Sequence, residues 1–201
     1  MRTTTAVLLA AGAGTRLGRG PKALLPFHGT SLVVHLGTEL LAGGCREVVV
    51  VIGAGAEDVR DAGLPLQCRT VENTRWADGM GGSFALGVAS VPEQDNVLVA
   101  LVDQPGVTAD LVARLLAAHR AGRITAAGYR PAAGVPGKLA RGHPILFDSA
   151  HAIQAAGSAT GDAGARLFLR SHAHLIDLVD CSDLSDGADV DTPAGLHLLE
   201  R

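Results

Sequence analysis

The chain has 201 residues, a formal net charge of -3 at pH 7, 47% hydrophobic residues and only 3% aromatic residues. This length suits one α/β domain over residues 1–201, with a core that Ala, Val and Leu must fill because aromatic side chains are scarce. The mild acidity, without a basic stripe, argues against nucleic acid as a partner.

Short segments rich in β-branched residues or leucine alternate with helical segments along the chain. Strands are predicted at 5–10, 47–52, 66–71, 97–102, 124–129, 143–147 and 174–179. Helices are predicted at 31–42, 55–62, 82–90, 108–120, 148–156, 162–170 and 192–200. The alternation predicts an α/β fold of three layers, in which a mostly parallel sheet lies between two layers of helices.

The ends of several helices and two irregular segments complete this outline. Ser31 and Thr108 are expected N-caps, Gly43-Gly44 is expected to end the first helix, and Thr192-Pro193 is expected to start the last one. The segment from Pro131 to Gly142 is predicted to be a substrate-facing loop or flap, and the segment from Ser182 to Gly187 a surface turn.

A glycine-rich loop with three cations follows the first predicted strand. Its glycines are at positions 12, 14, 18 and 20, and its cations are Arg16, Arg19 and Lys22. Glycine lets backbone N–H groups approach a ligand closely, and successive N–H groups form an anion-binding concavity. Arginine adds a bidentate fork and lysine a mobile point charge. The loop is therefore predicted to bind phosphate.

The spacing of this loop differs from two common phosphate-binding motifs. No lysine completes a Walker P-loop, and Gly12, Gly14 and Gly18 do not fit the dinucleotide fingerprint G-x-G-x-x-G. A second glycine pair, Gly53 and Gly55, has Asp58 where the third glycine belongs. A glycine-rich turn without a ligand is the alternative, which the three cations and the preceding apolar strand disfavour.

Aspartates follow two of the predicted strands. Asp103 comes directly after the strand at 97–102, and Asp189 and Asp191 come after the last strand. Ligands bind at the carboxyl ends of the strands in open α/β sheets, so we expect these carboxylates to converge with the glycine-rich loop. Asp103 has the alternative of organising a turn, and Asp191 that of favouring a helix N-terminus.

The cysteines and the apolar segments indicate the cellular compartment of the protein. Cys45, Cys68 and Cys181 include no Cys-x-x-Cys pair, which disfavours a disulfide framework or a structural zinc site and indicates a reducing compartment. The first predicted strand begins close to Met1, so we expect no signal peptide, and no apolar run reaches membrane-spanning length. We expect a cytoplasmic protein without a membrane partner.

The loop and five further segments carry a family resemblance. Residues 9–18 with Pro21-Lys22 resemble the signature of nucleotidyltransferases with a Rossmann-like fold. Within that superfamily the chain most resembles the molybdenum-cofactor cytidylyltransferases, a branch that also contains nicotine blue oxidoreductase-like proteins. The further matching segments are 79–83, 101–105, 142–144, 161–166 and 189–193. The resemblance implies a three-layer α/β/α nucleotidyltransferase fold with a mostly parallel mixed sheet.

The resemblance also implies a role for each matching residue. The nucleotide-binding residues would be Leu9, Ala10, Ala11, Gly12, Gly14, Arg16, Lys22, Gly79, Met80, Gly82 and Ser83. Arg16, Lys22 and Asp103 would form the catalytic set, with the two cations on the phosphates. Asp103 would bind Mg²⁺ with Asp191 or Asp189 as a second carboxylate, and His143 and Asp162 would face the second substrate.

Residue types alone leave structural alternatives for three of the polar or aromatic side chains. Ser83 has the alternative of capping a helix, and His143 that of a structural hydrogen bond beside Pro144. Trp76 is expected to pack under the 72–80 loop, with stacking on a substrate as its alternative.

The activity expected from this resemblance is transfer of CMP from CTP, or GMP from GTP, to a phosphorylated molybdopterin-type cofactor, with release of pyrophosphate. A phosphate monoester, whose second pKa is about 6, is largely dianionic at neutral pH and needs little help from a base. Positioning and charge neutralisation are then the main requirements, which Mg²⁺ and basic residues meet. A molybdoenzyme that receives the product is the expected macromolecular partner.

Two other functions remain open at the level of sequence. One is an NAD(P)H-dependent reductase of a pigment or quinone-like compound on the same scaffold. Gly53-Ala54-Gly55 at the end of the second strand offers no acidic residue to bind a ribose, which weakens this possibility. The other is an accessory protein that binds nucleotide or cofactor without catalysis.

Overall fold

The computed structural model describes residues 2–130 and 138–200, and its centre is a seven-stranded sheet of order β5-β4-β1-β6-β8-β7-β9. The strands are β1 Thr4–Leu9, β4 Val48–Ile52, β5 Cys68–Glu72, β6 Asn96–Leu101, β7 Ile124–Tyr129, β8 Ala140–Phe147 and β9 Ile176–Asp180. β8 is antiparallel to its neighbours β6 and β7, whereas the other pairings are parallel. The predicted mostly parallel mixed sheet is confirmed.

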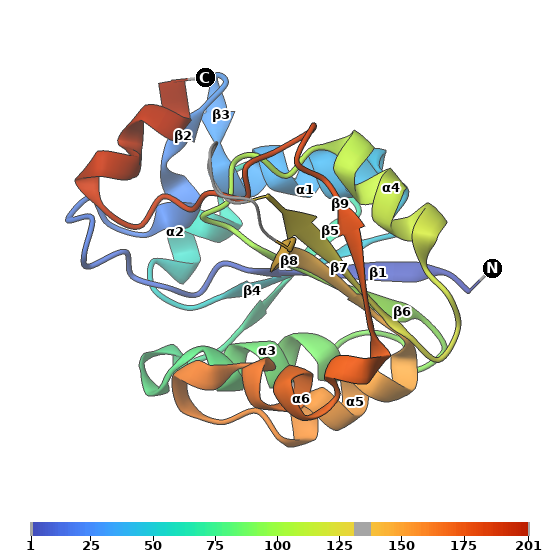
Figure 1. Ribbon diagram of the computed structural model, residues 1–201. Coiled ribbons are helices and arrows are strands. Elements are labelled where there is room, and N and C mark those ends of the chain that lie inside the picture. The colour runs from blue at the N-terminus through green and yellow to red at the C-terminus, as the bar shows by residue number, and fades with distance from the viewer. Residues whose placement is uncertain (1, 131–137, 201) are drawn as a thin grey trace.

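Helices cover both faces of the sheet (Figure 1). One layer contains α1 (Leu32–Ala42), α2 (Ala56–Arg60) and α4 (Ala109–Ala118), and the other contains α3 (Met80–Ala89), α5 (Ser149–Gly157) and α6 (Arg166–Ser171). Short 3-10 turns η1 (Lys22–Leu24), η2 (Trp76–Asp78), η3 (Gly161–Ala163) and η4 (Ala173–Leu175) lie between these elements. The predicted three-layer arrangement is therefore present.

Alternation along the strands divides the interior into two cores. In β1, Ala6 and Leu8 pack on the α1 side, while Val7 and Leu9 pack on the α3 side. Successive side chains of a strand point to opposite faces, so a strand covered by helices on both sides must be apolar throughout. All six residues of β1 and all five of β4 are buried.

Three predicted elements differ from the structure. The strand expected at 143–147 begins at Ala140, because Tyr129 and Gly128 of β7 extend the pairing to Ala140 and Arg141. It therefore takes in the end of the segment predicted as a loop from 131 to 142, of which residues 131–137 lie outside the described residues. The helix expected at 162–170 is divided into η3 and α6 at Gly164, whose φ of 49° is left-handed.

The C-terminal helix and the hairpin before α1 also depart from expectation. The segment predicted as a helix over 192–200 is the 3-10 helix η5 (Pro193–Glu200). The strands β2 (Pro26–Phe27) and β3 (Thr30–Ser31) form an antiparallel pair that was not predicted, since such short strands show no periodicity.

The expected helix ends are present, with one difference in bonding. The Thr108 hydroxyl accepts a hydrogen bond from the Leu111 N–H at 3.3 Å, as an N-cap does. Ser31 precedes α1 but makes no such bond, and Gly43 ends the helix. Among the described residues, no helix has the length and apolar character needed to cross a membrane.

Candidate functional site

The start of the glycine-rich loop is fixed between β4 and β6. The Ala10 N–H donates to the Val51 carbonyl at 2.9 Å, and the Val102 N–H donates to the Leu9 carbonyl at 3.1 Å. The Ala11 carbonyl accepts a hydrogen bond from the Ala54 N–H at 3.0 Å. The loop therefore leaves the sheet from a rigid base.

Gly14 sets the shape of this loop. Its φ is +64°, and a Cβ atom there would lie 2.3 Å from the Gly20 carbonyl oxygen. The Gly14 carbonyl accepts hydrogen bonds from the N–H groups of Leu17 and Gly18, at 3.0 and 3.2 Å. Only glycine fits both the backbone conformation and this close approach.

Lys22 joins the loop to two aspartates. Its Nζ donates to Asp103 Oδ2 at 2.8 Å and also bonds Asp191 Oδ1. The side chain of Lys22 is only 14% exposed, whereas Arg16 is 82% exposed and approaches Asp191 at 4.0 Å. The sequence-distant residues Lys22, Asp103 and Asp191 thus meet at the carboxyl edge of the sheet, as the strand ends predicted.

Asp103, Asp189 and Asp191 form an acidic cluster in which one oxygen from each lies within 4.8 Å of the others. The Val190 N–H donates to the Asp103 carbonyl at 2.8 Å, which holds the segment 189–191 beside Asp103. Asp103 Oδ1 is buried and has no hydrogen-bond partner among the described residues. Carboxylate oxygens are ligands that Mg²⁺ prefers, and a buried unpaired oxygen is costly without a ligand. The donor set therefore fits a divalent cation.

Charge pairing alters the proton affinities in this cluster. Burial opposes the charge of Lys22, but the hydrogen bonds and negative charges of Asp103 and Asp191 outweigh it and raise the Lys22 pKa above its usual value. The hydrogen bond from Lys22 lowers the pKa of Asp191. Burial, together with the charges of Asp103 and Asp191, raises the pKa of Asp189. The cluster therefore combines a fixed cation with closely spaced carboxylates.

A cavity of about 390 Å³ opens above this cluster. The predicted site residues that line it are Leu9, Ala11, Gly12, Gly14, Arg16, Lys22, Gly79, Met80, Ser83, Asp103, Asp162 and Asp191. Sequence reasoning did not select Thr15, Ala77, Leu101 or Val102, which also line it, and Trp76 lies in the lining as well. Ala10 is buried in the core beside α1 and Gly82 is exposed in the first turn of α3, so neither lines the cavity.

The start of α3 forms the opposite wall. Gly79 has a φ of +115°, and a Cβ atom there would lie 2.5 Å from the Gly161 carbonyl carbon. This close approach brings Asp162 into the cavity lining. Buried Ser83 accepts a hydrogen bond from Asn73 Nδ2 at 2.9 Å, so its hydroxyl hydrogen remains able to donate. Asn73 was missed, although its place directly after β5 is a signal of the kind that identified Asp103.

His143 lies outside the main cavity. It lines a smaller apolar cavity with Phe84 and Gly164, and Leu9 and Met80 line both cavities. Burial and the charge of Arg141 lower the His143 pKa to about 4, so the imidazole is neutral at pH 7. Its carbonyl accepts a hydrogen bond from the Tyr129 hydroxyl at 2.7 Å.

Known proteins share this arrangement of strands and helices. A nucleotidyl transferase from Methanothermobacter thermautotroptrophicus has a TM-score of 0.82 at 21% identity, covering 98% of this chain and 96% of its own, which confirms the nucleotidyltransferase fold. The structure of Rv0371C from Mycobacterium tuberculosis H37Rv in complex with manganese has a TM-score of 0.75 at 25% identity, covering 98% of both chains.

Sequence comparison extends the likeness beyond the fold. The chain is 49% identical over 195 residues to nicotine blue oxidoreductase from Paenarthrobacter nicotinovorans, which covers 97% of this chain and 95% of that protein. The model of the MobA-like NTP transferase domain matches residues 6–175, a range that contains the glycine-rich loop, Asp103 and the wall at α3. By fold and by sequence, the chain belongs to the family of MobA-like NTP transferase domains.

Proposed function

We propose that this chain is a divalent-metal-dependent nucleotidyltransferase that transfers CMP from CTP, with GTP as the less favoured donor, to a phosphorylated molybdopterin-type cofactor and releases pyrophosphate. The observation that carries the proposal is the meeting of Lys22 with Asp103 and Asp191 in a cavity of about 390 Å³ beside the glycine-rich loop. A metal–triphosphate complex needs this combination of carboxylates, cations and backbone N–H groups.

The proposal assigns the nucleotide to the wall built by β1 and α3. The backbone from Leu9 to Gly14 would approach the base and triphosphate, and Gly79 to Ser83 would line the other side. Arg16 and Lys22 would hold the phosphates and stabilise the charge that builds on the departing pyrophosphate. The Lys22 ammonium has three N–H donors and two carboxylate partners, so its third N–H would be available to a phosphate oxygen when the nucleotide enters.

Mg²⁺ is the metal that the proposal assigns to Asp103 and Asp191, with Asp189 beside them. Asp103 Oδ1 is buried and has no hydrogen-bond partner in the described part of the chain, which supports this choice, as does the manganese complex of the related Rv0371C. When bound, the ion would neutralise phosphate charge and orient the triphosphate.

The acceptor would enter from the side of Asp162 and His143. A phosphate monoester needs no strong base at neutral pH, because its second pKa is about 6. Neutral His143 would offer a hydrogen bond near the acceptor and not a charge, since its pKa is about 4.

Calorimetric titration with CTP, GTP and ATP, each with and without Mg²⁺, tests the donor. We expect MgCTP to bind most tightly. Asp103→Asn should weaken that binding roughly tenfold or more by removing one charged ligand. Asp61→Asn is the matched control, because Asp61 is an exposed carboxylate at the end of α2. Failure of every triphosphate to bind would overturn the proposal, and tight binding without pyrophosphate release in the presence of acceptor would favour an accessory role.

A second candidate is an NAD(P)H-dependent reductase, which the 49% identity to nicotine blue oxidoreductase favours. In that case the glycine-rich loop would hold a dinucleotide pyrophosphate. The end of β4 lacks an acidic residue for the ribose, since Gly53-Ala54-Gly55 stands there. Loss of nicotinamide absorbance with a quinone-like acceptor, in protein that releases no pyrophosphate from MgCTP, would establish this candidate over the first.

The proposal also includes the setting of the enzyme. Residues 1–201 would act as one domain in the cytoplasm and pass the product to a molybdoenzyme. The three free cysteines support a reducing compartment. Cell fractionation with co-purification of a molybdoenzyme is the corresponding measurement.

A further inference from the structure

Two arginines without ion-pair partners lie on the acceptor side of the site. Arg141 is the second residue of β8 and Arg166 is the first residue of α6. Both are exposed, and neither guanidinium group makes a hydrogen bond or ion pair with any residue in the ranges 2–130 and 138–200. By contrast, Arg114, Arg123 and Arg130 each form an ion pair with an aspartate.

The strand direction places Arg141 at the same edge as the cavity. β8 is antiparallel, so its first residues, and not its last, lie at the carboxyl edge of the parallel strands, where Arg141 pairs with Gly128. Between the pairs Ala126–Ile145 and Gly128–Arg141 the register of β7 and β8 shifts, so Arg141 and His143 are separated by one residue within an irregular part of the strand. The positive charge of Arg141 acts on the His143 ring, which agrees with their proximity.

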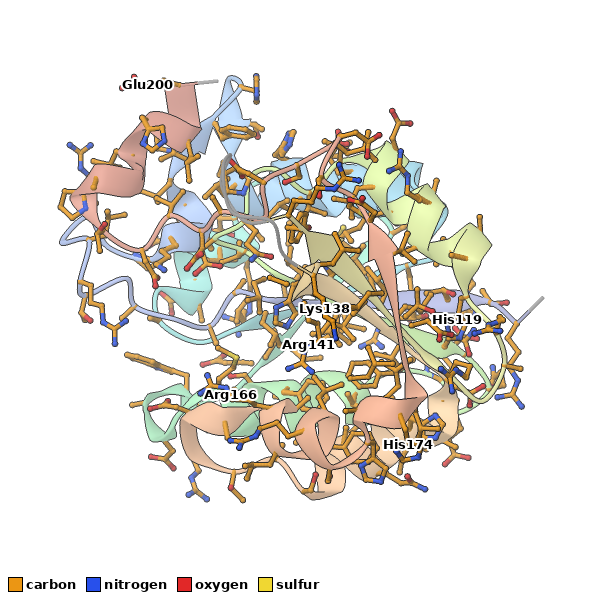
Figure 2. All side chains as sticks on the ribbon, viewed as in Figure 1. His119, Lys138, Arg141, Arg166, His174 and Glu200 are labelled. Atoms are coloured by element: carbon orange, nitrogen blue, oxygen red, sulfur yellow. The ribbon has the colours of Figure 1, made fainter. Side chains whose placement is uncertain are left out.

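Arg166 reaches this region from the helical layer. His143 shares its small cavity with Gly164 and Ala165, which directly precede Arg166. In the view of Figure 2, Arg141 comes from the sheet and Arg166 from the layer of α3, α5 and α6. Gly164, two residues before Arg166, lies close to Met80, because a Cβ atom on Gly164 would be 3.5 Å from the Met80 sulfur.

Met80 connects this region to the nucleotide cavity. It lines both cavities and is 43% exposed, which is high for a large apolar side chain at the first position of α3. Arg16 and Lys22 lie on the other side of the main cavity, where Asp191 already pairs with both. Neither Arg141 nor Arg166 lines the main cavity, so the cluster around Lys22 does not account for them.

We propose that Arg141 and Arg166 bind the phosphate of an organic phosphate monoester, the acceptor, whose apolar part lies over Met80. This inference rests on the proposed nucleotidyl transfer and names its acceptor subsite. In that reaction an oxygen of the acceptor phosphate attacks the α-phosphorus of CTP, a new P–O–P bond forms, and the bond to the β-phosphate breaks as pyrophosphate leaves. Arginine forks suit a phosphate dianion and reduce its repulsion from the triphosphate.

Phenyl phosphate is the probe for this subsite, with inorganic phosphate for comparison. Calorimetry on the full chain should give tighter binding of phenyl phosphate, because only its ring contacts Met80. Arg141→Gln and Arg166→Gln should each weaken it roughly tenfold or more, the usual effect of losing a hydrogen bond to a charged group. Arg170→Gln is the matched control, because Arg170 is an exposed arginine of the same helix α6 and forms no ion pair with a described residue. Equal affinity of the two ligands, or equal effects of Arg141→Gln and Arg170→Gln, would overturn the inference.

Two further measurements separate this inference from the proposed function and from misfolding. MgCTP should bind the Arg141→Gln protein as it binds the unaltered chain. If MgCTP binds neither the Arg141→Gln protein nor the unaltered chain, the nucleotidyltransferase proposal fails. The phenyl phosphate affinities still test whether Arg141 and Arg166 bind a phosphate monoester. In the unaltered protein, phenyl phosphate should protect Arg141 and Arg166, but not Arg170, from phenylglyoxal, as mass spectrometry of peptides would show. Absence of protection would also overturn the inference.

Discussion

Lys22 is the central residue of the site, because its single ammonium group bonds two carboxylates. Its bonds to Asp103 and Asp191 neutralise like charges that otherwise lie close together. A divalent cation at the same carboxylates would compete with the ammonium. We therefore expect the lysine to set the affinity of these carboxylates for a cation before any nucleotide arrives.

Replacing Lys22 by Met should make the protein depend more on metal. Without the ammonium, Asp103 and Asp191 repel each other, and Mg²⁺ relieves that repulsion. The rise in melting temperature on adding Mg²⁺ should exceed that of the unaltered chain by roughly 2–4 °C, which is about 1 kcal/mol for a chain of this size. Differential scanning fluorimetry measures this shift. Lys138→Met, at the other of the chain's two lysines, is the control, and equal shifts in both variants would contradict the competition.

His143 should make stability depend on pH. In the folded chain its pKa is about 4, below the ordinary value of 6.5. Between these two pH values the imidazole binds a proton in the unfolded chain but not in the folded chain. Its contribution to the free energy of unfolding is full above about pH 6.5 and falls as the pH decreases towards 4. From pH 7 to pH 5 the unaltered protein should lose about 1–2 kcal/mol more than His143→Gln. Urea unfolding at both pH values tests this, and parallel losses would show that another group is responsible.

At the level of elements, Tyr129 connects β7, β8 and the segment that carries two of the aspartates. A Cβ atom on Gly142 would lie 2.5 Å from the Tyr129 ring, and a Cβ atom on Gly187 would lie 2.4 Å from the same ring. The Tyr129 hydroxyl also bonds the His143 carbonyl. The position of Asp189 and Asp191 therefore depends on glycine at 187, close to where the chain passes over the ring.

Gly187→Ala should weaken metal binding without altering a ligand. The added methyl group meets the Tyr129 ring and displaces the segment with Asp189 and Asp191. Gly63→Ala is the matched control, because Gly63 has a φ of +83° and Gly187 one of +68°, yet nothing lies within 4 Å of a Cβ at 63. We expect Mn²⁺ affinity, measured by electron paramagnetic resonance, to fall roughly tenfold in Gly187→Ala, given strain of 1–3 kcal/mol at such positions. The same loss in Gly63→Ala would instead assign the effect to general destabilisation.

The elements also show what sequence can and cannot predict. Buried strands such as β1 and β4 are continuous apolar runs, so the sheet and the convergence of Lys22, Asp103 and Asp191 follow from strand ends alone. The reversal of β8 does not, because alternation along a strand carries no direction. That reversal is what brings Arg141 to the site edge. Asn73 and the small cavity of His143 likewise depend on packing between distant segments.

At the scale of the whole molecule, the reactivity of the three cysteine thiols depends on how deeply each is buried. Cys45 and Cys181 are buried and Cys68 is half-buried, all as free thiols. Burial raises the pKa of Cys45 to about 12 and that of Cys68 to about 11, so neither forms much thiolate at pH 8.

The folded protein should therefore react slowly with Ellman's reagent at pH 8, with Cys68 first. In guanidinium chloride all three thiols should react quickly. The absorbance of the released thiolate follows both reactions. Rapid reaction of Cys45 in the folded chain would contradict the packing of the α1 layer, and Cys68→Ser assigns the first phase.

The sheet between the two cores also has a consequence for how this family diversifies. Leu17 and Val190 pack in the core on the α1 side, whereas Phe84, His143 and Ala165 lie on the α3 side. Because Leu9 and Met80 line both cavities, only changes at residues confined to the small cavity, such as Phe84 or Ala165, leave the lining of the main cavity unaltered. We expect such changes to alter the small cavity while Lys22, Asp103 and Asp191 keep their places, because function depends on the residues of a site and not on the fold alone.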